Sequence, residues 1–259
     1  MANLFDLRGK VALVTGGNGG VGLGFAQALA EHGADIVIWG TNATKNAAAA
    51  AQLEATGRRV LALQCDVGDH AAVGAAMDQT VEAFGRLDAC FVNAGVPGGG
   101  IPFVDFTMEE WHRVMRINLD GAFSTAQAAC RVMKAQFERE GVGGSIVFSS
   151  SGSAFQGQQK GEHYGASKAG LNAMMRAIAV EHARHRIRAT SLVIGWTESE
   201  MTAPSFAYKK FADNVMPRIP MRRWGKPADL GGIAVYLTSD ASSWHTGDII
   251  TIDGGYSIY

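Results

Sequence analysis

The chain has 259 residues, of which 47% are hydrophobic and 18% charged, with a formal net charge of −1 at pH 7. Such a chain can bury one sizeable core, and its scattered basic residues argue against a surface for nucleic acid or anionic membranes. The three cysteines, Cys65, Cys90 and Cys130, show no metal-ligand spacing. We therefore expect neither a metal site nor a disulfide framework.

The first residues, Met1 to Asp6, have neither the basic nor the apolar region of a secretory signal. No later window holds about 18 consecutive apolar residues, the length that a membrane span requires. We expect a soluble, cytoplasmic protein with one domain over residues 1–259.

Apolar runs of strand length alternate with segments of helical periodicity along the whole chain. The predicted strands cover residues 10–15, 35–39, 60–65, 87–92, 145–149, 187–193 and 249–252. The predicted helices cover residues 25–32, 43–55, 70–84, 108–139, 163–185 and 228–238. Buried strands separated by helices are typical of a parallel sheet that is covered on both faces. The predicted fold class is α/β, a doubly wound sheet of seven parallel strands flanked by helices.

A glycine-rich loop connects the first predicted strand to the first predicted helix. It fits two dinucleotide-binding templates, G-x-G-x-x-G from Gly17 and G-x-x-x-G-x-G from Gly16. Glycines permit a tight turn and let backbone N–H groups approach a pyrophosphate at the helix N-terminus. The residues expected to surround it are Gly16, Asn18, Gly19, Gly20, Val21 and Gly22. A purely structural turn is the alternative.

At the head of the predicted helix 163–185, Tyr164 and Lys168 lie four residues apart. This spacing places both side chains on one helical face, so an ammonium group can lie beside a phenol. A free tyrosine has a pKa of about 10, and a nearby cation or the positive end of a helix dipole lowers it. The pair therefore predicts acid–base chemistry. A pattern this short also fits a half-buried tyrosine and a solvated lysine, so the other parts of a site are needed.

Further motifs supply those parts, and with them the chain resembles the short-chain dehydrogenase/reductase superfamily over essentially its whole length. The motifs are Thr15-Gly16-x-x-x-Gly20-x-Gly22, Asp66-Val67, Asn93-Ala94-Gly95, Asn118, Ser151 thirteen positions before Tyr164, Tyr164-x-x-x-Lys168 and Ile252-Asp253-Gly254-Gly255. The resemblance implies a Rossmann fold and an NAD(P)-dependent oxidoreductase that interconverts a ketone and a secondary alcohol by hydride transfer.

The resemblance also implies roles for four catalytic residues. Tyr164 would be the general acid or base, and Lys168 would lower the pKa of the phenol and bind the nicotinamide ribose. Ser151 would bind the substrate oxygen, and Asn118 would support a water that relays protons. Only the spacing prefers Ser151 over its serine neighbours Ser149, Ser150 and Ser153. The alternative for Asn118 is a buried amide that satisfies backbone groups.

The remaining cofactor contacts are implied in the same way. Asp66 and Val67 would contact the adenine, although Asp66 could also be a capping residue after a strand. The adenosine ribose side would be lined by Asn93, Ala94 and Gly95. After the sixth strand the family usually has Pro-Gly and a threonine, whereas this chain has Ile194-Gly195-Trp196-Thr197-Glu198-Ser199. Gly195, Thr197 and Ser199 are expected to contact the nicotinamide, in a loop made less rigid by the missing proline.

The end of the second strand decides between the two nicotinamide cofactors. An NAD site usually has a carboxylate there, and an NADP site has Arg or Lys. This chain has Trp39-Gly40-Thr41-Asn42, with neither charge, and Gly19 stands where NADP enzymes often have a basic residue. Thr41, Asn42 and Lys45 could bind a 2′-phosphate, so NADP(H) is the favoured cofactor.

The stretch 194–227 is the least regular and is interpreted as a flexible substrate flap or as a surface excursion. The candidate pocket residues are Val96, Ser153, Phe155, Gln156, Trp196, Met201, Phe206 and Tyr208. They favour a small to medium, partly hydrophobic ketone. The alternatives are a 3-oxoacyl-[acyl-carrier-protein] reductase, which would favour a basic docking face, and a non-catalytic dinucleotide sensor. The resemblance further implies a homotetramer.

Overall fold

The computed structural model describes residues 3–98 and 100–259. Met1 and Ala2, which belong to the segment expected to lack a secretory signal, lie outside this part. Seven parallel strands form one sheet in the order β3-β2-β1-β4-β5-β6-β7. They are β1 (Val11–Thr15), β2 (Asp35–Gly40), β3 (Val60–Gln64), β4 (Ala89–Val92), β5 (Gly144–Ser151), β6 (Ile187–Ile194) and β7 (Ile249–Ile252). The predicted fold class is confirmed.

The sheet reverses its winding direction between β1 and β4. From β1 the chain moves outward through β2 to β3, then returns to pair β4 against the other edge of β1. The carboxyl ends of β1 and β4 therefore open into a crevice, where doubly wound folds bind ligands. The glycine loop follows β1 and the Asn93-Ala94-Gly95 motif follows β4, so both motifs lie at this crevice.

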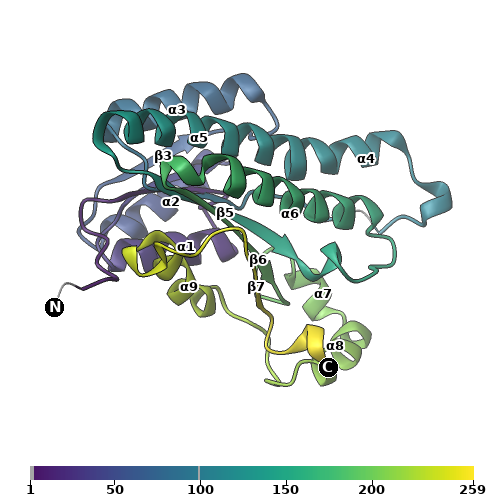
Figure 1. Ribbon diagram of the computed structural model, residues 1–259. Coiled ribbons are helices and arrows are strands. Elements are labelled where there is room, and N and C mark those ends of the chain that lie inside the picture. Colours follow the sequence, from purple (N-terminus) through teal and green to yellow (C-terminus); the bar gives the residue numbers. More distant parts are fainter. Residues whose placement is uncertain (1–2, 99) are drawn as a thin grey trace.

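Helices cover both faces of the sheet (Figure 1). The longer elements are α1 (Gly20–Glu31), α2 (Ala43–Glu54), α3 (His70–Phe84), α4 (Met108–Met115), α5 (Gly121–Glu140), α6 (Glu162–His182) and α9 (Gly231–Thr238). One buried cluster joins the sheet to α3, α5 and α6, and the other joins it to α1, α2 and α9. These two apolar layers hold the strand ends in place beneath the site.

Two predicted helices differ from the observed ones in ways that affect the site. The helix predicted over 25–32 begins at Gly20, inside the glycine loop. The helix predicted over 108–139 is three elements, because a π-helical turn, η2 (Arg116–Asp120), separates α4 from α5. This turn carries Asn118, whose side chain bonds the Val96 backbone instead of pointing to solvent. π-helical turns inside helices often occur at functional sites.

The predicted flap, 194–227, contains two short helices, α7 (Ala203–Ala207) and α8 (Lys209–Val215), and the turn η5 (Met216–Arg218). They lie beside the C-terminal turn (Figure 1). Edge-to-face packing joins Trp196 to Phe211 at 4.9 Å between ring centroids, and Phe206 stacks on Trp224 at 4.0 Å. This segment is therefore organised by aromatic contacts.

Two helical glycines should respond in opposite ways to alanine. A Cβ at Gly22 would lie 2.2 Å from the Gly16 carbonyl oxygen, whereas a Cβ at Gly74 would meet no other part of the chain within 4 Å. We expect Gly22→Ala to lower the free energy of unfolding by about 1–3 kcal/mol, because the loop has to move. Gly74→Ala should raise it by about 1 kcal/mol through helix propensity. Urea unfolding measures both changes, and equal effects would contradict the observed packing of the loop.

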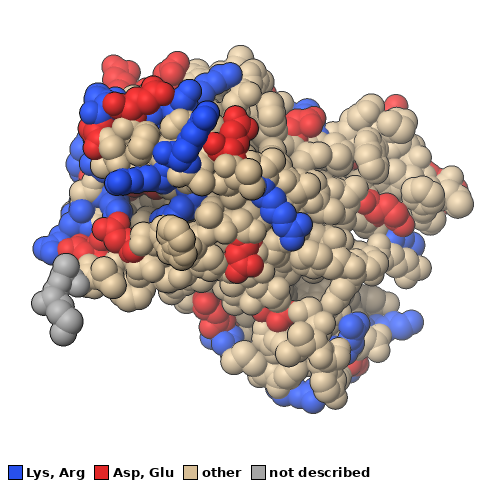
Figure 2. Space-filling view, viewed as in Figure 1, with Lys and Arg blue, Asp and Glu red and all other residues tan. Residues whose placement is uncertain are grey.

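The face of the molecule in Figure 2 has basic and acidic side chains interspersed, without an extended surface of one sign. Among the described residues, none of the helices combines the length and the apolar character needed to span a bilayer.

Candidate active site

The glycine loop is shaped by contacts that leave no room for side chains. Gly16 has φ +63°, and a Cβ there would lie 3.2 Å from Ala94 Cα. At Gly17 a Cβ would lie 2.6 Å from an Ile38 methyl carbon. The loop is therefore pressed between β2 and the start of the segment that follows β4.

The N-terminus of α1 is open to a ligand. Gly19 is its N-cap residue, and no side chain caps the first amides of the helix. A Cβ at Gly19 would meet no atom within 4 Å, so the space beside this residue is free. Unpaired amides and the helix dipole favour an anion such as a pyrophosphate. Of the other predicted contacts here, Val21 is half-buried and packs against the core beneath α1.

Asn93 and Thr15 fasten the carboxyl ends of β4 and β1 to each other. The Thr15 hydroxyl accepts hydrogen bonds from the amides of Asn93, at 2.9 Å, and Ala94, at 3.0 Å. The Asn93 side chain donates to the Thr15 carbonyl at 3.0 Å and accepts from the Ser149 hydroxyl at 2.9 Å. Asn93 thus has a clear structural role at the base of the crevice.

The η2 turn brings Asn118 to the segment after β4. Its side-chain oxygen accepts from the Val96 amide at 2.8 Å, and its side-chain nitrogen donates to the Val96 carbonyl at 3.0 Å. A Cβ at Gly95 would lie 3.2 Å from the Asn118 oxygen and 3.6 Å from Lys168 Nζ. Gly95 therefore lies between Asn118 and Lys168, and the amide also satisfies backbone groups, as the alternative reading expected.

Lys168 is buried, with 5% of its surface exposed. Its ammonium donates to the Ser149 carbonyl at 2.8 Å. Burial lowers the pKa of this ammonium from 10.5 to about 8, because the charged form loses its hydration. The group is still mostly charged at neutral pH.

Tyr164 lies half-buried in the first turn of α6, with Lys168 Nζ 5.5 Å from its ring centroid. The net shift of the Tyr164 pKa is upward, opposite to the lowering expected from the spacing to Lys168. Burial raises that pKa, and the Ser151 hydroxyl opposes the rise only in part. The charged phenolate would lose its hydration on burial, and this effect is the larger one. A phenol with a raised pKa keeps its proton at neutral pH.

The four serines around the end of β5 have different surroundings. Ser149 donates to Asn93, and Ser150 is 3.4 Å from the Lys168 carbonyl. Ser153 has a buried hydroxyl without a partner in the described part of the chain. Ser151 accepts from the Ser153 amide at 3.3 Å and interacts with the Tyr164 phenol. Its contact with the phenol distinguishes Ser151 from the others.

On the predicted adenine side, Asp66 is not free. It forms an ion pair with Arg116 at 3.1 Å and accepts from the Gly68 amide at 2.9 Å. Asp69, not Asp66, is the N-cap residue of α3. Val67 is buried, and its carbonyl packs closely on Gly121. Arg116 was missed as a neighbour of this site, since nothing in the sequence links it to a residue 50 positions away.

The end of β2 meets the N-terminus of α2. Thr41 is exposed, while the Asn42 side chain caps α2 by accepting from the Lys45 amide at 3.0 Å. Asn18 donates to Asn46 at 2.7 Å, which ties the glycine loop to α2. The Lys45 ammonium forms an exposed ion pair with Glu200 of the flap.

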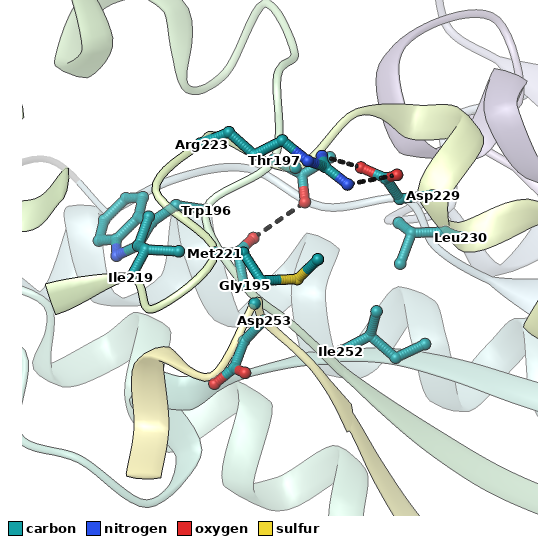
Figure 3. A pocket seen from close by; sticks show the side chains of 12 residues that line it. Gly195, Trp196, Thr197, Ile219, Met221, Arg223, Asp229, Leu230, Ile252 and Asp253 are labelled. Atoms are coloured by element: carbon teal, nitrogen blue, oxygen red, sulfur yellow. Dashed lines mark hydrogen bonds and ion pairs between the residues drawn. The ribbon is translucent and has the colours of Figure 1, made fainter. Parts of the chain in front are cut away.

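The loop after β6 lines a pocket of about 240 Å³ (Figure 3). Gly195 packs on Asp253, and the Thr197 hydroxyl donates to the Gly195 carbonyl at 3.1 Å. Ser199 exchanges hydrogen bonds with Thr202, and its Cβ would lie 3.0 Å from a Cβ at Gly20. The flap therefore begins against the glycine loop. None of Asn118, Ser151, Tyr164 and Lys168 lines this pocket.

The predicted substrate residues separate into four groups. Val96 is held by Asn118. Trp196 and Phe206 belong to an aromatic cluster, the group of rings formed by Trp196, Phe206, Phe211, Trp224 and Tyr256. Ser153, Phe155 and Gln156 line a second, open pocket of about 550 Å³ at the head of α6. Met201 and Tyr208 are 42% and 61% exposed. The prediction missed the cluster members Phe211, Trp224 and Tyr256. Their aromatic character is a signal, but their proximity is not readable from sequence.

The described residues include no group of three or more His, Cys, Asp or Glu side chains placed to hold a metal ion.

Comparison with known proteins agrees with this geometry. A family model described as Enoyl-(Acyl carrier protein) reductase matches residues 16–257. The chain is 36% identical to 2-dehydro-3-deoxy-D-gluconate 5-dehydrogenase of Dickeya dadantii (strain 3937), over 98% of each chain. It resembles a short-chain type dehydrogenase/reductase from Mycobacterium marinum, with a TM-score of 0.91, 36% identity and coverage of 98% and 97%.

It also resembles a gluconate 5-dehydrogenase from Burkholderia cenocepacia J2315, solved in complex with NADP and tartrate. That match has a TM-score of 0.92 and 34% identity, covering 99% of this chain and 98% of the other. These matches span nearly the whole chain and include the glycine loop and the Tyr164-x-x-x-Lys168 pair. The chain is therefore a member of the short-chain dehydrogenase/reductase superfamily, whose enzymes oxidise CH–OH groups, or reduce the corresponding carbonyl groups, with a nicotinamide dinucleotide.

Proposed function

We propose that this enzyme interconverts a ketone and a secondary alcohol with Tyr164 as the proton carrier, and that NADP(H) is its preferred cofactor. The observation that carries the proposal is the meeting of Ser151, Tyr164 and Lys168 at the carboxyl end of β5. The Ser151 hydroxyl interacts with the phenol, and the Lys168 ammonium lies 5.5 Å from the Tyr164 ring. A hydroxyl, a phenol and a cation at one place can bind a carbonyl oxygen and protonate it.

The proton chemistry follows from the surroundings of each group. Because burial raises the pKa of Tyr164, the phenol holds its proton at neutral pH and can give it to a carbonyl oxygen. The Lys168 ammonium then stabilises the phenolate that remains. In the alcohol-to-ketone direction the phenolate takes the proton back. Ser151 donates a hydrogen bond to the substrate oxygen as negative charge develops there.

The nicotinamide dinucleotide supplies or accepts the hydride, and the crevice has features that fit it. The uncapped amides of α1 and the open space at Gly19 would hold the pyrophosphate. Gly95, between Asn118 and Lys168, leaves space on the ribose side, and Ser199 would face the carboxamide. Asp66 would contact the adenine while keeping its ion pair with Arg116.

Two features at the end of β2 support NADP(H): the crowding around Gly40 and the charge at the N-terminus of α2. A carboxylate at position 40, as an NAD site usually has, would need a Cβ 2.3 Å from Asn18 Nδ2 and 2.5 Å from Asn46 Oδ1. The first turn of α2 contains no acidic residue, so its N-terminus favours an added phosphate. Lys45 would move from Glu200 to the 2′-phosphate. Two related structures hold NADP and a third holds NAD+, so the choice depends on this chain's own residues.

Thr41→Asp tests this preference. We expect the new carboxylate to weaken NADPH binding by about tenfold or more, which is about 1.4 kcal/mol, with little loss of NADH binding. The matched control is Gln52→Glu, which adds the same charge to an exposed position in the last turn of α2. Fluorescence titration with NADH and NADPH measures both variants. A wild type that binds NADH more tightly than NADPH would overturn the preference.

The substrate is expected to have an apolar or cyclic part beside its carbonyl. Ser151 pairs with Ile194, the last residue of β6, in the sheet. Trp196 therefore lies two residues past the carboxyl end of β6, the end at which Ser151 also lies. Trp196 leads into the cluster with Phe206, Phe211 and Tyr256. A sugar acid is the second candidate, because a relative 36% identical to this chain is named for one. Comparing kcat/KM for a cyclic diketone and a keto-gluconate decides between them.

Two other readings have less support. The face in Figure 2 shows interspersed charges and no basic surface for an acidic carrier protein. A non-catalytic sensor would not need a phenol, a buried ammonium and a serine hydroxyl together.

We also propose that the enzyme is a homotetramer, from family membership. Light scattering should give four times the protomer mass of 27.4 kDa, and a mass near one protomer would contradict it.

A further inference from the structure

His163 immediately precedes Tyr164 on α6 and is fully buried. Its ring packs edge-to-face on Phe106, with 4.5 Å between the centroids. Gly98 packs closely against the same ring, since a Cβ there would be 2.6 Å from His163 Cε1. The residue beside the proton carrier is therefore enclosed by the segment that follows β4.

A hydrogen bond fixes the ring to α4. His163 Nε2 lies 3.2 Å from Glu110 Oε1. Arg113 donates two hydrogen bonds to the Glu110 carboxylate, at 2.6 and 2.8 Å, and with His163 it lowers the pKa of Glu110 to about 2. The carboxylate is thus charged at working pH, and His163 Nε2 is the donor.

The contacts from His163 through Glu110 and Arg113 also reach the segment after β4. The Arg113 guanidinium also donates to the Pro97 carbonyl at 2.9 Å. Residues 95–98 therefore contact three elements in succession: Gly95 and Val96 lie at Asn118, Pro97 is held by Arg113, and Gly98 covers His163. The segment that borders Lys168 is connected to the residue next to Tyr164.

Within α6 the Ser167 hydroxyl donates to the Tyr164 carbonyl at 2.8 Å, but the start of the helix is not capped by a side chain. Gly161 is its N-cap residue. His163 Nδ1 is buried and has no partner in the described part of the chain. If the ring at position 163 served only for packing, an apolar ring would fill the same space. It would also avoid the free-energy cost of burying a polar nitrogen without a hydrogen bond.

We propose that His163 is a positioning residue, which holds Tyr164 in reach of the substrate oxygen through its bond to Glu110. The inference rests on the proposed function of Tyr164 as proton carrier. Misplacement of a reacting group by about 1 Å can cost about a hundredfold in rate. His163 touches neither substrate nor cofactor in this account, and it acts only through the backbone of α6.

Three variants and one control test the proposal. His163→Phe fills the space without the hydrogen bond, His163→Gln can restore a donor, and Glu110→Gln removes the charge. Glu109→Gln is the control, because Glu109 is the exposed neighbour of Glu110 on α4. We expect His163→Phe to lower kcat by about 10- to 100-fold, with KM and NADPH affinity changed less than about threefold.

The solvent deuterium isotope effect on kcat separates positioning from packing. It should rise in His163→Phe and Glu110→Gln, because proton transfer from Tyr164 becomes slower, and return toward the wild-type value in His163→Gln. Glu109→Gln should behave as the wild type. A folded His163→Phe variant with wild-type kcat would overturn the proposal. So would equal losses in the Phe and Gln variants with an unchanged isotope effect.

A second readout works without turnover. The chain has five tyrosines, so ¹³Cζ-tyrosine NMR gives few signals, and Tyr164→Phe assigns the relevant one. We expect this signal to shift or broaden in His163→Phe and to stay near its wild-type position in His163→Gln. An unchanged signal in His163→Phe would refute the positioning role. Absence of turnover by the wild type would instead count against the proposed function alone.

Discussion

Replacing Tyr164 with phenylalanine is expected to lower kcat by about 10³-fold, within the range that general acid–base catalysis contributes. The variant removes the phenolic O–H and keeps the ring that packs at the head of α6. NADPH binding should therefore remain within about twofold of the wild type, and the loss should fall on kcat rather than on KM. Steady-state kinetics and fluorescence titration measure these quantities separately.

The control for this prediction is Tyr259→Phe, which removes the same oxygen from an exposed residue at the C-terminus. It should have wild-type kinetics. Equal turnover by Tyr164→Phe and the wild type would show that the proton comes from another group. Ser151→Ala would then be the next variant to examine.

Lys168→Met is expected to have opposite effects on activity and stability. Loss of the ammonium leaves the Tyr164 phenolate without its cation, so kcat should fall by about 10²-fold or more. Stability should rise near pH 7. A pKa lowered from 10.5 to about 8 means that folding disfavours the charged lysine by about 3 kcal/mol. Losing the hydrogen bond to Ser149 offsets about 1 kcal/mol of the gain.

The pH dependence of this stability difference has a definite sign. Between about pH 8 and 10.5 the unfolded lysine binds more protons than the folded one, so wild-type stability rises with pH. The advantage of the methionine variant should be largest below about pH 8 and should shrink through this window. Urea unfolding at pH 7 and pH 10 measures it. A variant that is less stable than the wild type at pH 7 would contradict the burial of a charged Lys168.

The strands were predictable because most are short apolar runs, and such runs form buried parallel sheets, whereas their order in the sheet comes from the structure alone. The glycine loop was predictable because its backbone conformations and close contacts require glycine, as at Gly16 and Gly22. Both depend on short stretches of sequence and on steric rules that hold in any fold. The family and its reaction class could be inferred from the same local motifs.

Other features depend on contacts between distant residues. The π-helical turn at Asn118 exists where its amide bonds Val96, 22 positions away. The direction of the pKa shift of Tyr164 depends on burial, which the spacing to Lys168 does not reveal. Likewise, the pairing of Asp66 with Arg116 joins residues 50 positions apart. The sequence could name Asn118, Tyr164 and Asp66 as candidates, but only the structure shows what occupies their polar atoms.

Hydride transfer to a carbonyl carbon is the central claim, and isotope transfer tests it most directly. The purified enzyme would be incubated with NADPH carrying deuterium at both C4 positions and a panel of cyclic ketones and keto-sugar acids. Mass spectrometry of the products should find one deuterium on the new carbinol carbon, and Tyr164→Phe should reduce its amount by about 10³-fold. Bound NADPH without deuterium in any product across the panel would contradict the claim.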